Sequence, residues 1–153
     1  MTNASKADLQ LSPLNHDGDR TQIMPEIAKL TLLAMAFLLI KHALADFFFQ
    51  SAYQYANKGR YGHPGGLLHS FIHTAMTIPV FLILPSNLSL AAAVLIGEFV
   101  LHYHIDWIKE QIIAAGGWTP NIAKFWNALG VDQLFHGLTY IAIVAVLIAK
   151  PMG

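Results

Sequence analysis

Histidines and carboxylates recur four residues apart inside long apolar stretches of this chain. The stretch 42–50 reads HALADFFFQ and places His42 one helical turn before Asp46. An ionisable side chain at the centre of a membrane-spanning helix costs about 2.5–3.5 kcal/mol, so such residues are rare and usually functional. The pattern therefore limits the chain to folds that bury apolar helices and gather polar side chains between them.

The apolar runs are long enough to cross a membrane. Only 12% of the residues are charged and 55% are hydrophobic, whereas about 25% are charged in an average soluble domain. We predict spanning helices over about 25–55, 65–84, 88–113 and 122–149, because about 20 apolar residues suffice to cross a bilayer. Segments such as LTLLAMAFLLI are apolar on every side, which argues against a soluble four-helix bundle with polar outer faces.

The predicted fold is therefore all-α, an integral membrane four-helix bundle formed by residues 25–153. Residues 1–24 are polar and contain no apolar core of signal-peptide length, so we expect a flexible tail. Pro25 suits a first helical turn, and Pro79 is expected to kink the second span. Ser86 or Ser89 is the expected cap of the third helix.

Each predicted helix carries its own set of ionisable side chains. Residues four apart lie on one helix face, so four helices can present donors to a shared centre, as in carboxylate–histidine bundles. All of the sets fall in the half of the bundle near loops 56–64 and 114–121, and the opposite half is almost purely apolar. We therefore predict one polar site in one half of the bundle. The sets are His42 and Asp46; His69 and His73; Glu98, His102 and Asp106; and Asp132 and His136.

The donor types point to a divalent metal. Imidazole and carboxylate without sulfur suit zinc, iron or manganese, and the chain contains no cysteine. We expect zinc, with iron or manganese as alternatives. The donor residues are more numerous than the four ligands of one tetrahedral ion. Either two metals bind, or some of the residues orient the ligands instead of binding metal. The predicted ligands are His42, Asp46, His69, His73, His102, Asp106, Asp132 and His136.

Individual residues of this set could have a structural role instead of binding metal. A single histidine can form a hydrogen bond between helices, and an aspartate such as Asp106 can pair with Lys41 or Lys109. Gln133 could orient a ligand or simply join two helices. Lys58 and Lys109 could meet an anionic headgroup, although ordinary interfacial lysines explain them more simply.

The quoted motifs are similar to those of a known family. HALADFFFQ, HSFIHT, HYHIDWIK and VDQLFH resemble an uncharacterised bacterial and phage integral membrane family, the domain of unknown function 3307, over about residues 30–145. The resemblance implies that the motifs act as a unit in a multi-pass protein of the bacterial inner (plasma) membrane, and it implies no activity. The matching positions are His42, Asp46, Gln50, Lys58, His69, His73, His102, Asp106, Lys109, Asp132, Gln133 and His136.

The leading functional hypothesis is a metal-dependent hydrolase that acts on a membrane lipid or lipid-linked substrate. The metal would activate water, and Glu98 or Asp132 would act as the catalytic base. A di-iron oxidoreductase uses the same ligands and is less favoured. The alternatives are a metal or proton transporter, and an accessory subunit that binds haem or quinone through histidine. A net charge of zero gives no reason to expect nucleic acid, and a homo-oligomer or larger membrane complex stays possible.

Overall fold

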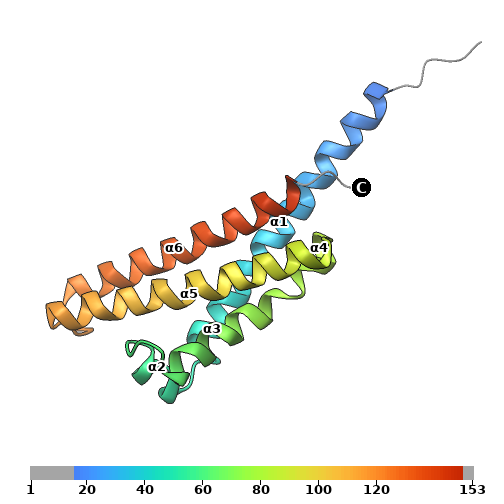
Figure 1. Cartoon of the computed structure of the whole chain (residues 1–153). Helices are drawn as coiled ribbons and strands as arrows, with labels where there is room; N and C mark the ends of the chain where they lie inside the picture. Colours follow the sequence, from blue (N-terminus) through green and yellow to red (C-terminus); the bar gives the residue numbers. More distant parts are fainter. Residues whose placement is uncertain (1–15, 150–153) are drawn as a thin grey trace, which may run out of the picture.

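The computed structural model describes residues 16–149, and within that range it contains helices and no strand. The all-α fold class is thus confirmed. Residues 1–15 of the predicted tail and residues 150–153 lie outside the described part, and α1 begins at His16, before Pro25. Figure 1 shows the elements α1 (His16–Phe47), α2 (Ala52–Asn57), α3 (Pro64–Thr77), α4 (Val80–Ile83), α5 (Leu88–Gly116) and α6 (Ala123–Ile148).

Four segments of the described chain are long and apolar enough to cross a membrane. They are Pro25–Phe47, Pro64–Ile83, Leu88–Gly116 and Ala123–Ile148. Large apolar side chains on their outer faces, such as Leu33, Ile96 and Val131, are about half exposed or more. Lipid is the natural neighbour of such faces, so the structure agrees with a multi-pass membrane protein.

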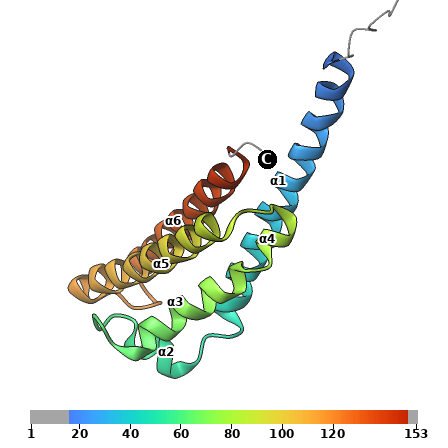
Figure 2. The ribbon, with the colours of Figure 1, turned by 45° about the vertical axis from the view of Figure 1, so that its right-hand side comes forward.

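The spanning helices form a closed ring. α1 packs against α3 and α6, and α5 packs against the same two helices. In Figures 1 and 2, α5 and α6 run side by side, while the N-terminal turns of α1 extend beyond the bundle. The short α2 packs on α3. All four spans therefore face one interior, as the spacing of the ionisable residues requires.

The first span is shorter than predicted, and its predicted end at Tyr55 is wrong. α1 ends at Phe47, and the backbone N–H groups of Phe48 and Phe49 both donate to the carbonyl of Leu44. A new helix, α2, then begins after Ser51, whose side chain accepts a hydrogen bond in a capping box with the third residue of the helix. This break was not predicted, because the apolar residues continue through it in the sequence.

Pro79 interrupts the second span as predicted, because the helix breaks there into α3 and α4. Proline lacks an N–H group and its ring clashes with the preceding turn of a helix. The start of α5 differs from expectation. Asn87, rather than Ser86 or Ser89, caps it by accepting a hydrogen bond from the Leu90 N–H at 2.9 Å.

The bundle interior is divided into an apolar half and a polar half. The apolar half includes α4, the start of α5 and the end of α6, and its buried residues are Ala34, Leu38, Val80, Leu84, Val94, Tyr140, Ile143, Val144 and Leu147. The buried polar residues of the spans lie beyond it. This confirms a polar histidine–carboxylate cluster in one half of the bundle.

An ion pair marks the boundary between the halves. Lys41 of α1 lies with its Nζ 2.5 Å from Glu98 Oε1 of α5, and it also donates to the carbonyl of His73 at 2.9 Å. Thr77 of α3 donates to the same Glu98 oxygen at 2.9 Å. All of these side chains are fully buried. The ion pair thus ties three helices together in a low-dielectric interior.

Removing one partner of this pair should destabilise the bundle strongly. We expect Lys41→Met to lower the free energy of unfolding by about 3–5 kcal/mol, because Glu98 would remain as an unpaired buried charge. The double variant Lys41→Met, Glu98→Leu should recover most of the loss. Unfolding in mixed detergent micelles measures both. Lys29→Met is the control, because the Lys29–Glu26 pair is 70% and 64% exposed; an equal loss in Lys29→Met and Lys41→Met would contradict the expectation.

Candidate metal centre

Histidine and carboxylate side chains from all four spanning helices meet in the polar half of the bundle. Each histidine of the predicted ligand set is at most 5% exposed, and the carboxylates are nearly as deeply buried. The structure therefore brings the whole predicted set into one cluster. The contributions are His42 and Asp46 from α1, His69 and His73 from α3, His102 and Asp106 from α5, and Asp132 and His136 from α6.

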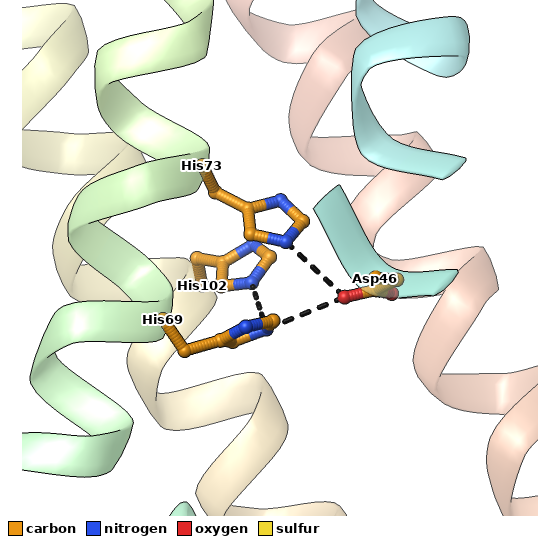
Figure 3. A group of neighbouring side chains, drawn as sticks. All are labelled: Asp46, His69, His73 and His102. Carbon is orange, nitrogen blue, oxygen red and sulfur yellow. Dashed lines mark hydrogen bonds and ion pairs between the residues drawn. The ribbon is translucent and has the colours of Figure 1, made fainter. Parts of the chain in front are cut away.

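The first donor group consists of Asp46, His69, His73 and His102, with one ligand atom from each within 4.8 Å of the others. Asp46 Oδ1 lies 3.3 Å from His69 Nε2 and 3.2 Å from His73 Nε2. His102 Nε2 lies 3.3 Å from His69 Nε2. Figure 3 shows the imidazoles gathered opposite the Asp46 carboxylate, which reaches them from another helix. Histidine nitrogens with a carboxylate oxygen form a donor set that zinc accepts in tetrahedral geometry.

The second donor group consists of Asp106, Asp132 and His136, again with ligand atoms within 4.8 Å. His136 Nε2 lies 3.8 Å from Asp106 Oδ1 and 3.6 Å from Asp132 Oδ1. The group shares no residue with the first, so each can hold its own ion. The two groups touch where His69 Nε2 lies 3.0 Å from Asp106 Oδ2.

A third group, His42, His102 and His136, connects the other two. The ring centroids of His102 and His136 are 4.2 Å apart, and those of His42 and His136 are 4.7 Å apart. Both ring nitrogens of His42 already have partners, the Tyr140 hydroxyl at 2.9 Å and the Gln133 Oε1 at 3.0 Å. His42 thus stays a predicted ligand through this third group, and its present partners hold its ring in place.

Gln133 holds one carboxylate of each donor group. Its Nε2 donates to Asp46 Oδ2 at 3.0 Å and to Asp132 Oδ2 at 3.2 Å. The Oδ1 atoms of both aspartates are thereby left facing the histidines. Gln133 thus orients the predicted ligands Asp46 and Asp132 and also joins α6 to α1. Gln50, among the described residues, donates only to the Asp46 backbone carbonyl, at 3.4 Å.

Lys58 and Lys109 are buried in the site, contrary to the simpler expectation of interfacial lysines. Lys58 Nζ lies 3.4 Å from Asp106 Oδ1, and Lys109 Nζ lies 4.0 Å from the same oxygen. Gly66 makes the approach of Lys58 possible, because a Cβ there would lie 3.3 Å from the Lys58 Cα. The end of α2 therefore places the Lys58 ammonium inside the bundle.

Two carboxylates of the cluster have no lysine or arginine partner among the described residues. Lys41 pairs with Glu98, and the Lys109 ammonium lies closest to Glu110, at 2.6 Å. Only histidines lie at ion-pair distance from Asp46 and Asp132. Burying an uncompensated carboxylate is costly, and a divalent cation at this place would balance the charge.

Unsatisfied buried atoms gather at the same place. Buried polar atoms are nearly always hydrogen-bonded, yet several atoms here lie close to one another without forming hydrogen bonds. A cation between facing imidazole and carboxylate lone pairs would satisfy such atoms together. Among the described residues, the unsatisfied ligand-type atoms in this cluster are Asp46 Oδ1, His73 Nδ1 and Nε2, His102 Nδ1, Asp106 Oδ2, Asp132 Oδ1 and His136 Nε2.

The two carboxylates predicted as catalytic bases differ in position. Glu98 belongs to none of the donor groups and is held by Lys41, whereas Asp132 belongs to the second group. His104, which lies between His102 and Asp106 in the sequence, is peripheral, since it contacts the Tyr61 hydroxyl at 3.2 Å outside the cluster. Tyr140, whose hydroxyl contacts His42, was not predicted as a site residue, although it continues the four-residue spacing of Asp132 and His136 on α6.

The fold and the cluster define a class: a multi-pass α-helical membrane protein with a buried histidine–carboxylate centre. The family described as "Protein of unknown function (DUF3307)" matches residues 34–152, and the chain belongs to it. The match confirms the resemblance drawn from the motifs and covers every residue of the centre. No curated protein and no solved structure matches the chain.

Metal content should follow the two donor groups separately. With two ions bound to the wild type, we expect about one ion in His73→Ala, about one in Asp132→Ala and none in the double variant, since each substitution removes a donor from one group. Elemental analysis of purified, metal-loaded and dialysed protein measures this. His104→Ala is the matched control and should keep both ions. Equal metal in the wild type and the double variant would refute the site.

Proposed function

We propose that this protein is a membrane-embedded, metal-dependent hydrolase that acts on a lipid or lipid-linked substrate. Two divalent ions, zinc by preference and iron or manganese as alternatives, would occupy the two donor groups. One observation carries the proposal: two ligand sets without a common residue lie side by side in a buried cluster, joined by the 3.0 Å approach of His69 to Asp106. Paired ions of this kind are typical of enzymes that hydrolyse phosphoryl and acyl compounds.

The bound ions would supply a nucleophile at neutral pH and polarise the scissile group. The chain supplies the rest. Gln133 holds the Asp46 and Asp132 carboxylates in place through their Oδ2 atoms. Asp132 is the better candidate for the proton acceptor, because it lines two cavities, whereas Glu98 is fully buried against Lys41 and lines neither of these cavities. Glu98 then has a structural role in this proposal.

The alternative functions have less support. A transporter needs a polar path across the bundle, yet the interior beyond the cluster is filled by a packed apolar core among the described residues. An accessory subunit that binds haem needs space for a macrocycle between its histidines. The ring centroids of His73 and His102 are 3.9 Å apart, and those of His102 and His136 are 4.2 Å apart, so the imidazoles are in contact.

Turnover should require both the metal and Asp132. Protein in liposomes of extracted, labelled lipid should release a product, lose activity with a chelator and regain it with zinc. Asp132→Asn should lower the rate by at least about 10²–10⁴-fold, because a general base contributes that much and the second donor group also loses a carboxylate. Mass spectrometry of the lipids follows the reaction, and His104→Ala is the control. Metal uptake into sealed liposomes without any change in the lipids would instead favour the transporter.

A further inference from the structure

Two cavities meet at the candidate metal centre and share Lys109 and Asp132. One of about 640 Å³ lies between α5 and α6, and one of about 180 Å³ lies among the end of α1, α2, α5 and α6. Of these two shared residues, Asp132 is a carboxylate of the second donor group, and Lys109 is a buried lysine. The two cavities therefore lie on either side of the same two side chains.

The larger cavity is a groove with apolar walls that opens on the membrane. Ile108 and Ile112 of α5 face Val131 and Phe135 of α6 across it, and these side chains are 48–53% exposed. Both helices are long and apolar enough to span a membrane, where lipid chains would reach this groove directly. Its volume falls in the range of about 300–1,000 Å³ that binds small molecules.

The smaller cavity is charged. It is lined by Asp46 and Asp132, one carboxylate from each donor group, and by Lys58 and Lys109. With two divalent ions in place, the ions and the two lysines outweigh the carboxylates of Asp46, Asp106, Asp132 and Glu110. The loaded cavity thus attracts an anion.

We propose that the substrate is an anionic amphiphile with a phosphate headgroup. This inference rests on the proposed function, because the ions provide part of the positive charge. The apolar chain lies in the α5–α6 groove, and the headgroup passes Lys109 and Asp132 into the smaller cavity. Phosphate fits better than carboxylate because it presents enough oxygens to serve two lysines and the ions together.

The hydrolysis balances without any further reactant. The oxygen of water forms a bond to phosphorus, and the bond from phosphorus to the ester oxygen of the leaving alcohol breaks. One proton of the water passes to the Asp132 carboxylate and from there to the leaving oxygen. The products are an alcohol and a phosphate compound, and nothing is oxidised or reduced.

Photo-crosslinking in lipid nanodiscs tests the substrate class. The probes are phosphatidic acid with a photoreactive acyl chain, and diacylglycerol and fatty acid with the same reactive chain. We expect phosphatidic acid to label residues 105–112 of α5 and 128–135 of α6, and Lys109→Gln to reduce this labelling about tenfold through loss of one charge-assisted contact. Lys29→Gln, which removes an exposed lysine far along α1, should not change it.

A second variant tests the groove without altering charge. Ala128→Trp should block the groove and abolish labelling, whereas Ala92→Trp, on an exposed part of α5 outside the groove, should leave it intact. Equal labelling by diacylglycerol or fatty acid would overturn the inference, as would labelling that Ala128→Trp does not reduce. Metal content and turnover are measured on the same samples. If the protein binds metal and turns over lipids but shows no preference for those with a phosphate headgroup, this inference alone is refuted. If the protein binds no metal, the proposed function is refuted.

Discussion

Buried negative charge is the constraint on which the rest of the structure depends. Asp46 and Asp132 lie in a low-dielectric interior with only histidines at ion-pair distance among the described residues. Such an arrangement is stable only if positive charge is added, and the surrounding imidazole nitrogens are arranged as ligands would be. The need to bury this charge explains the positions of the helices. It also explains the supporting amide of Gln133 and the two nearby lysines.

The two halves of the bundle have different tasks. The apolar half packs α1, α4, α5 and α6 around a core that, among the described residues, contains no histidine, lysine, arginine or carboxylate, and it fixes the relative positions of the helices. The Lys41–Glu98 pair closes the polar half against it. On the other side, the break after α1 turns the chain back so that α2 and Lys58 cover the cluster. The result is a centre that is shielded from the apolar core yet open toward the α5–α6 groove.

The features that depend on spacing within one helix were predictable from the sequence. Histidines and carboxylates four residues apart had to share a face, and their position along each span placed them at one level. Partners across helices were not predictable. Lys41 with Glu98, Lys58 with Asp106 and the bridge of Gln133 depend on which helices are neighbours and on how far long side chains reach. The end of α1 was missed because its apolar run continues through the turn.

X-ray absorption at the zinc edge of the zinc-loaded protein probes the candidate metal centre directly. The arrangement predicts imidazole scattering with nitrogen and oxygen ligands at about 2.0–2.1 Å and a second metal at about 3.5–4 Å. His73→Ala should weaken the imidazole signal, and Asp132→Ala should remove the metal–metal feature. A spectrum of zinc surrounded by water oxygens, identical in the wild type and in both variants, would show that the four helices do not bind metal where their donors meet.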